Sequence, residues 1–358
     1  MMPTELIALT HKIEANRRID GEEALFLLEQ ADLLHLGALA DARRKHLHPE
    51  PRVTYVVDRN INYTNICVSG CRFCAFYRQP SQADGFIISE AELCDKIEET
   101  LALGGTQILL QGGMHPELDL DFYVNLLTFI KNNFPIHIHG FSPPEISFLA
   151  EKTGKPLAEV LQTLIAAGLD SIPGGGAEIL VDDIRTQLSP GKCLTDRWLE
   201  VMRVGHQLGL RTSATMMFGH IEDRAHIVEH LLRIRDLQDE TGGFTAFIPW
   251  TFQPDNTGLD VEKASAAEYL KVLALSRLVL DNIDNIQASW VTQGAKIAQV
   301  ALAFGANDLG STMIEENVVA AAGVRFRLPL AEMKRLIATA GYEACQRDCY
   351  YNLIPAEK

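Results

Sequence analysis

The spacing of hydrophobic residues changes after the first fifty positions of the chain. In GEEALFLLEQADLLHLGALADARRKHL, residues 21–47, apolar side chains recur at helical spacing with charged residues between them. The next segment, RVTYVVDRNINYT, is rich in the β-branched and aromatic residues typical of strands. The pattern predicts a helical extension over residues 1–50 and a different structural unit over residues 51–358.

Within this second unit, strand-like runs alternate with amphipathic helices. The runs are TYVV, TQILLQGG, IHIHGFS, LDSIPGGG, RTSATMMFGH, GFTAFIPW, NIQASW and NDLGSTM. Such alternation requires a parallel sheet, because each helix returns the chain to the same edge. Eight units predict an α/β fold, a closed (β/α)8 TIM-type barrel with the helical extension at its N-terminus. An open doubly wound sheet is the alternative.

Three cysteines follow the first strand and open toward the face where barrels place their active sites. They are spaced Cys67-x3-Cys71-x2-Cys74, with Phe73 before the last. Structural zinc sites and electron-transfer iron–sulfur clusters need four ligands. Three thiolates can instead hold three irons of a [4Fe–4S] cluster and leave the fourth iron to a small molecule. A zinc site completed by a distant histidine, and simple buried thiols, are the alternatives.

The other four cysteines carry no such spacing. Cys94 and Cys193 are isolated, and Cys345 and Cys349 stand four apart, as if facing one another in a C-terminal helix. We expect all four to serve packing.

Glycines and charged residues mark further strand ends. Gly112 and Gly113 end the second strand and would let a backbone approach a ligand closely. Glu178 and Arg185 follow a three-glycine turn, where a carboxylate can accept ribose hydroxyls and an arginine can bind a carboxylate. A surface ion pair on the outside of a helix is the alternative.

Candidates for proton transfer are Glu145, His139 and His220, all near strand ends. His137 shares a strand face with His139 but lies deeper. Residues 288–317 are unusually polar and Gly-rich, and we expect them to line a pocket for a large polar substrate, mainly through Trp290, Thr292, Gln293 and Asn307. Loop capping is the alternative for part of this set, especially Asn307.

Charge and composition indicate which kinds of molecule the protein binds and where it works. The formal net charge is −15 and the pI is about 5.2, which argues against nucleic-acid binding. No apolar run is long enough to span a membrane, and the N-terminus lacks a signal-peptide pattern. Seven cysteines, an odd number, argue against a disulfide framework. We expect a cytoplasmic protein that acts on a small molecule.

The cysteine loop resembles the radical S-adenosylmethionine (SAM) superfamily, whose signature is C-x3-C-x-aromatic-C. Together, RNINYTNICVSGCRFCAFYR, QGGMHPEL, HGFSPPEI, PGGGAEIL, TMMFGHIED and ASWVTQGAKIAQVALAFGANDLGSTMIEENVV resemble the cyclic dehypoxanthinyl futalosine synthases of the futalosine route to menaquinone. The resemblance runs over about residues 24–322. It implies a [4Fe–4S] cluster on the three loop cysteines and SAM bound near Phe73, Gly112, Gly113, Glu178 and Arg185. The family's Gly-Gly-Glu-like motif reads Gly-Gly-Met here, so only its backbone role carries over.

The resemblance also implies a reaction. A 5′-deoxyadenosyl radical takes a hydrogen from the ribose 4′ carbon of dehypoxanthinyl futalosine, the new radical closes a ring onto the benzoate, and an electron and a proton are lost. A flavodoxin or ferredoxin would supply the reducing electron. Aminofutalosine synthase, a component of the synthase of the deazaflavin FO, and a non-enzymatic iron–sulfur or zinc module are the alternatives.

Overall fold

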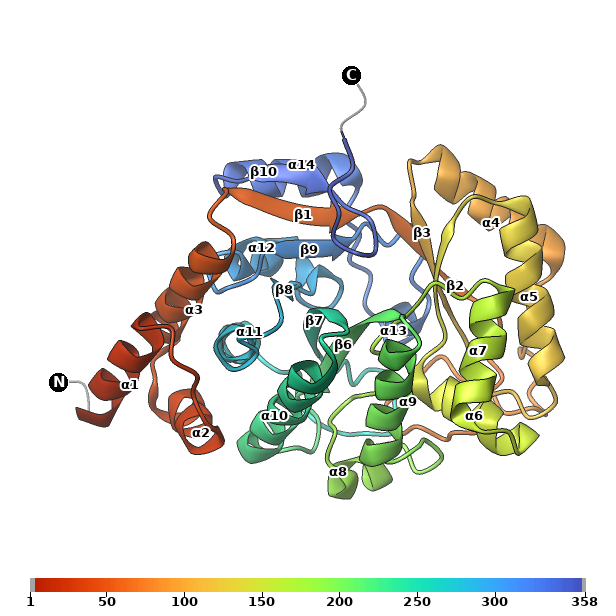
Figure 1. Cartoon of the computed structure of the whole chain (residues 1–358), viewed down its shortest axis with the longest axis horizontal. Helices are drawn as coiled ribbons and strands as arrows, with labels where there is room; N and C mark the ends of the chain where they lie inside the picture. The colour runs from red at the N-terminus through yellow and green to blue at the C-terminus, as the bar shows by residue number, and fades with distance from the viewer. Residues whose placement is uncertain (1–3, 356–358) are drawn as a thin grey trace.

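The computed structural model describes residues 4–355, which begin with three helices (Figure 1). These are α1 (Thr4–Glu14), α2 (Gly21–Gln30) and α3 (Leu33–Leu47). Asp20 and Glu23 form a capping box at the start of α2, and Asp32 caps α3, so the two helices separate at Ala31. Helices α2 and α3 pack against α10 (Arg224–Thr241) and α11 (Ala266–Val279). The division of the chain at residue 50 stays a prediction.

Seven parallel strands form one curled sheet in chain order. They are β2 (Asp58–Asn62), β3 (Gln107–Gln111), β4 (His137–Gly140), β5 (Ser171–Ile172), β6 (Arg211–Phe218), β7 (Phe244–Thr251) and β8 (Asn285–Ile286). A second parallel sheet joins β1 (Arg52–Val56) to β9 (Asp308–Ser311) on one side and β10 (Glu343–Gln346) on the other.

The two sheets meet along β9. A bridge joins Gln287 to Asp308, and Ile314 donates its backbone N–H to the carbonyl of Asp58, 3.2 Å away. Because β1 leads directly into β2, these contacts bring the last strands of the chain beside the first. The TIM-type α/β prediction is confirmed.

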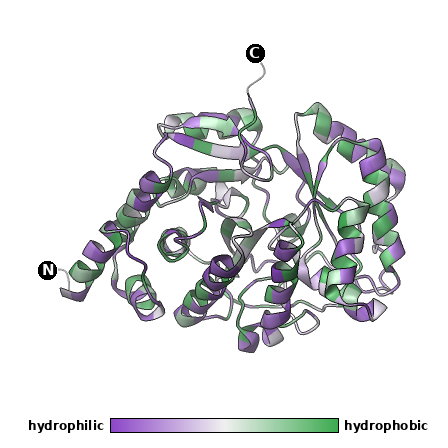
Figure 2. Cartoon of the chain, viewed as in Figure 1, coloured by the Kyte–Doolittle hydropathy of each residue, from purple (hydrophilic) through white to green (hydrophobic). Residues whose placement is uncertain are grey.

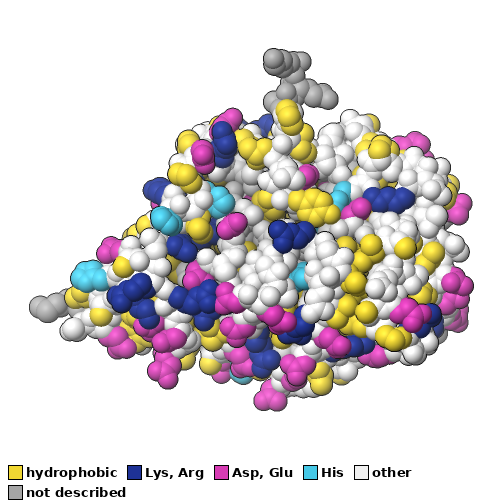
Figure 3. Space-filling model, viewed as in Figure 1, with side chains coloured by type: hydrophobic (Ala, Val, Ile, Leu, Met, Phe, Trp, Pro, Cys, Tyr) yellow, Lys and Arg dark blue, Asp and Glu magenta, His cyan; other side chains and the backbone are white. Residues whose placement is uncertain are grey.

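Helices surround the sheet, and those seen side-on in Figure 2 mix green and purple residues along their length, as amphipathic helices do. Besides α10 and α11 they are α4 (Glu90–Ala102), α5 (Leu120–Asn133), α6 (Pro143–Thr153), α7 (Leu157–Ala167), α8 (Asp182–Leu188), α9 (Thr195–Gln207), α12 (Trp290–Ala301), α13 (Val318–Ala321) and α14 (Leu330–Thr339). In α9, for example, Trp198, Val201 and Met202 are buried. Acidic and basic side chains are interspersed over the face shown in Figure 3. Among residues 4–355, no helix combines the length and the apolar character needed to cross a membrane.

Two predicted elements differ from the structure. The strand expected over residues 52–64 is divided between two sheets, and β2, rather than TYVV, precedes the cysteine loop. The C-terminal helix expected around Cys345 and Cys349 is wrong. Cys345 lies in β10, paired with Thr54 of β1, and Cys349 lies in the following turn. This pairing with a strand far away in the sequence overrides the local pattern.

Candidate functional site

The cysteine loop folds tightly over the C-terminal end of β2. The N–H of Cys67 donates to the carbonyl of Arg78 at 2.9 Å, and the N–H of Arg72 donates to the carbonyl of Leu188 at 2.8 Å. The Ser69 hydroxyl lies between two thiols, 3.0 Å from Cys67 Sγ and 3.2 Å from Cys71 Sγ. The loop therefore directs its sulfur atoms into the protein.

The thiols are poorly solvated. Burial raises the pKa of Cys71 to about 11, although the charge of Lys192 opposes this shift. Burial also raises the pKa of Cys74. Iron would displace the thiol protons on binding. Within residues 4–355, no three His, Cys, Asp or Glu side chains converge as a single metal ion requires. A cubane cluster takes one thiolate per iron, so three separated thiols on one loop fit it better than they fit zinc.

Gly112 and Gly113 allow the end of β3 to lie against this loop. A Cβ on Gly112 would be 2.5 Å from the ring of Tyr63, and a Cβ on Gly113 would overlap the carbonyl oxygen of Ile66. Met114 N–H donates to Cys67 Sγ at 3.3 Å. Both glycines are therefore needed for close backbone approach, as the sequence predicts.

Glu145 supports this arrangement from outside the barrel cavity. Its carboxylate accepts the N–H of Gly112 at 3.1 Å, the hydroxyl of Tyr63 at 2.7 Å and the N–H of Ser142 at 2.7 Å. Burial raises the pKa of Glu145, and the bonds from Ser142 and Tyr63 oppose that shift. These contacts favour a role in holding the strand ends, and its predicted role as a base gains no support from them.

Glu178 and Arg185 are both buried, so the alternative of a surface ion pair is wrong. Glu178 has a positive φ of 41°, an uncommon conformation for a non-glycine residue, and its Oε2 has no hydrogen-bond partner among residues 4–355. Arg185 donates to the carbonyls of Gly176 (3.1 Å) and Cys193 (2.7 Å) and lies 4.0 Å from Glu178. The orphaned oxygen of Glu178 fits a ligand hydroxyl, whereas Arg185 positions the turn.

Lys192 connects this turn to the cysteine loop. Its Nζ donates to Glu178 Oε1 at 2.8 Å and lies 5.0 Å from the centre of the Phe73 ring. Although burial opposes it, the charges of Cys71 and Glu178 hold the pKa of Lys192 above its usual range. A half-buried cation whose charge reaches the thiols of Cys71 and Cys74 would stabilise a negatively charged cluster.

A cavity of about 290 Å³ occupies the barrel interior. Glu178, Trp290, Thr292 and His139 line it, and other lining residues are Asp58, Asn60, Gln107, Gln111, Ser213, Ile248, Trp250, Arg347, Cys349 and Tyr351.

Two predicted substrate residues lie outside this lining. Asn307 is engaged by Arg277 (2.6 Å), Asn285 (2.8 Å) and the N–H of Ile286 (2.9 Å), as the capping alternative expects. Gln293 does not line the cavity either and donates to Thr251 Oγ1 at 2.6 Å.

The two histidines predicted to transfer a proton, His139 and His220, lie in different cavities. His139 Nδ1 is 2.7 Å from Ser171 Oγ, which is also 2.7 Å from His137 Nε2. Burial, together with the charges of His137 and Arg347, lowers the pKa of His139 to about 3. His220 instead pairs with Glu222 at 2.7 Å and lines a second cavity between α10 and α11. Only His139 therefore faces the main cavity.

Comparisons with known proteins identify this architecture. The family described as the Radical SAM superfamily matches residues 61–234, and the CofH/MqnC C-terminal region matches residues 241–358. A cyclic dehypoxanthine futalosine synthase from Halalkalibacterium halodurans is 45% identical over 94% of this chain and 92% of its own length. The chain belongs to the radical SAM superfamily.

The relatives of this radical SAM protein include proteins with two different names. A cyclic dehypoxanthine futalosine synthase from Streptomyces coelicolor is 43% identical over 97% of this chain and 88% of its own. A 5-amino-6-(D-ribitylamino)uracil–L-tyrosine 4-hydroxyphenyl transferase from Methanoculleus marisnigri is 40% identical over 99% of both chains. The crystal structure of methylornithine synthase shares the fold, with a TM-score of 0.74, 19% identity, and coverage of 94% of this chain and 97% of that one.

Radical SAM enzymes use a [4Fe–4S] cluster and SAM, and the site of this radical SAM protein fits both. Sequence reasoning missed Lys192, because nothing in its local sequence ties it to a loop 118 positions earlier. It also missed Asp58 and Asn60, although polar residues at alternate positions of a buried strand were the signal that could have found them.

Proposed function

We propose that this radical SAM enzyme converts dehypoxanthinyl futalosine into its cyclic form in menaquinone biosynthesis. The observation that carries the proposal is the 45% identity to a cyclic dehypoxanthine futalosine synthase, sustained over 94% of the chain. The cavity in the barrel interior supports it, because a radical reaction needs walls that limit access of water.

When bound, the cluster and SAM supply a 5′-deoxyadenosyl radical that can abstract a hydrogen atom. Cys67, Cys71 and Cys74 would hold the cluster, and Lys192 would balance its charge. Glu178, with its unpartnered oxygen, would accept a hydroxyl of SAM. Gly112 and Gly113 would let SAM approach the end of β3.

The cavity residues hold the ribose and the arene of the substrate close enough for ring closure, an entropic contribution to the rate. Ring closure ends with loss of a proton and one electron from the substrate radical, and that electron would pass to the cluster, which the cleavage of SAM leaves oxidised. Of the three predicted candidates for proton transfer, His139 alone lines this cavity, and we propose it as the acceptor on that position, although burial lowers its pKa and makes it a weak base.

We also propose that the enzyme works in the cytoplasm and receives its reducing electron from a protein such as flavodoxin or ferredoxin. All seven cysteines are free thiols, as a reducing compartment would keep them.

The transferase is the second candidate function, because the identity to that relative covers 99% of the chain. One labelling experiment separates the candidates. The anaerobically reconstituted enzyme is incubated with SAM and substrate deuterated at the ribose 4′ carbon, and 5′-deoxyadenosine is analysed by mass spectrometry. Deuterated 5′-deoxyadenosine is expected. Unlabelled 5′-deoxyadenosine would contradict the abstraction site, an adenosylated product would indicate aminofutalosine synthase chemistry, and turnover only with tyrosine and the ribitylaminouracil would establish the transferase.

A further inference from the structure

The inner face of two neighbouring strands is polar. Asp58 and Asn60 on β2, and Gln107 and Gln111 on β3, all line the cavity, with Leu109 the one apolar side chain of these two strands among them, and Asp58 pairs in register with Gln107. We call the four polar residues the polar wall. Barrel interiors are usually filled by branched aliphatic side chains, so four polar residues here require an explanation other than packing.

Two acceptors of the polar wall have no partner. Asn60 and Gln107 are each only 5% exposed, yet Asn60 Oδ1 and Gln107 Oε1 make no hydrogen bond within residues 4–355. The Gln107 amide nitrogen is used, donating to Asp58 Oδ2 at 2.8 Å. Buried polar atoms are normally hydrogen-bonded, so these oxygens point to a ligand that donates hydroxyl hydrogens.

A different surface lies across the barrel. Strand β7 is four places from β3 in the strand order, and its Ile248 and Trp250 line the cavity. Trp290, at the start of α12, adds a second indole, fixed by its N–H donating to the carbonyl of Ser311 at 2.8 Å. We call Ile248, Trp250 and Trp290 the aromatic wall. Indole rings, one of them held by this hydrogen bond, suit a flat arene.

We propose that the polar wall binds the pentose of the substrate and the aromatic wall binds its arene. This inference rests on the proposed function, whose substrate has both parts. The proposal also fixes how the substrate is oriented relative to the cysteine loop. Strands β2 and β3 carry the cysteine loop and Gly112–Gly113 at their C-terminal ends, so a sugar on the polar wall lies on the side of the radical source.

The test measures binding and product separately. Asn60→Leu removes an unpartnered amide, and Asn125→Leu makes the same change on the exposed face of α5 as a control. Each reconstituted, SAM-loaded protein is titrated anaerobically with dehypoxanthinyl futalosine and with a benzoate ketone that lacks the pentose. We expect Asn60→Leu to weaken binding of the full substrate about tenfold or more, and binding of the ketone less than about twofold. Trp250→Leu should weaken the binding of both ligands, because both contain the arene.

A structural role for Asn60 predicts a different pattern. If the amide only supported the fold, Asn60→Leu would lower the melting temperature and weaken both ligands alike. We expect an unchanged or higher melting temperature, because a buried unpaired amide is removed, and a larger fraction of unlabelled 5′-deoxyadenosine. Unchanged affinity for the full substrate, or equal weakening of both ligands, overturns the assignment.

Failure of the proposed function is distinguishable from failure of this inference. If the unmodified enzyme converts tyrosine and the ribitylaminouracil instead, the proposed function is wrong, and the same variants are titrated with the ribityl compound and with tyrosine. Selective weakening of the polyhydroxylated ligand by Asn60→Leu still supports the polar wall, and its absence overturns it.

Discussion

Single thiols determine whether the cysteine loop holds iron. Cys67, Cys71 and Cys74 share one loop, whereas Cys94 lies on α4. We expect Cys71→Ala to lose nearly all iron and sulfide after reconstitution, because a cluster with two protein ligands is poorly held. Iron analysis and the visible absorption spectrum measure this. Cys94→Ala is the control and should match the unmodified protein, and a Cys71→Ala protein with full iron would exclude Cys71 as a ligand.

The buried imidazole of His139 makes the stability of the protein sensitive to acid. Its folded pKa of about 3 lies below the ordinary value of 6.5, so between these values the unfolded chain binds more protons. The contribution of the neutral imidazole to the unfolding free energy is fully present above pH 6.5. It is lost as the pH falls from 6.5 toward 3. From pH 7 to pH 5, the unfolding free energy should fall by about 2 kcal/mol more in the unmodified chain than in His139→Asn.

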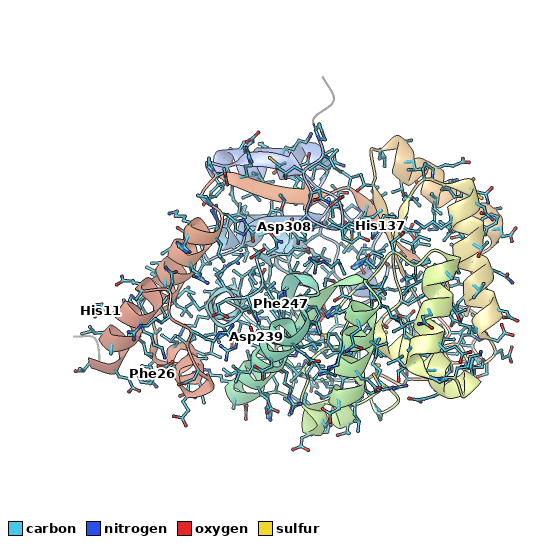
Figure 4. The ribbon with its side chains drawn as sticks, viewed as in Figure 1. His11, Phe26, His137, Asp239, Phe247 and Asp308 are labelled. Atoms are coloured by element: carbon cyan, nitrogen blue, oxygen red, sulfur yellow. The ribbon has the colours of Figure 1, made fainter. Side chains whose placement is uncertain are left out.

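Urea denaturation of the cluster-free protein under reductant at both pH values measures this difference. His11→Asn, at an exposed position of helix α1 (Figure 4), should behave as the unmodified chain. Parallel pH dependence in the His139→Asn and unmodified proteins would contradict the assignment.

The residues of the site were predictable to the extent that they are close in sequence. Cys67, Cys71 and Cys74 lie within eight positions, and Gly112–Gly113 ends a recognisable strand. Lys192 lies near the cysteine loop only because the fold brings the end of α8, four residues before it, against that loop. Asn307 was predicted to bind substrate and instead lies outside the cavity lining, because a polar residue in a Gly-rich stretch gives no sign of which buried partners it will meet.

At the scale of elements, the end of β3 and the cysteine loop act as one unit. Gly113→Ala places a methyl group against the carbonyl of Ile66 and near Cys67. We expect iron content after reconstitution to fall at least about twofold, since the loop must move away from its place. Gly205→Ala, inside α9, meets only ordinary contacts at 3.4 Å or more and should keep full iron. Equal iron in the two variants would show that the close approach is not required.

Elements were predicted well where a long amphipathic helix follows a strand. The strands β5 and β8 have only two residues each, yet the helices around them made their place clear. The C-terminal strand β10 was mistaken because its partner, β1, lies some 290 residues away and no local pattern reports it.

At the scale of the whole molecule, the C-terminal segment is joined to the barrel by a buried ion pair. Arg347 donates to both carboxylate oxygens of Asp308, at 2.6 and 3.0 Å, and Figure 4 marks Asp308 near β1. Arg347→Met leaves this carboxylate unpaired and should lower the unfolding free energy by about 3–5 kcal/mol. Arg52→Met breaks only the exposed pair with Glu343 and should cost less than about 1 kcal/mol. Chemical denaturation compares them, and similar losses would contradict the prediction.

The pairing of β1 with β9 and β10 also sets an order of events during synthesis. Thr54 of β1 can form its hydrogen bond with Asp308 only after Asp308, 254 residues further along the chain, has been synthesised. At about 5–20 residues per second, a ribosome needs roughly 13–50 s to cover that distance. Until then β1 has neither neighbour, and the main sheet is open along β2 and β8. A chain that stops before residue 308 therefore presents two unpaired parallel edges that can recruit strands of other chains, and a nonsense mutation there yields an aggregation-prone product instead of a smaller barrel.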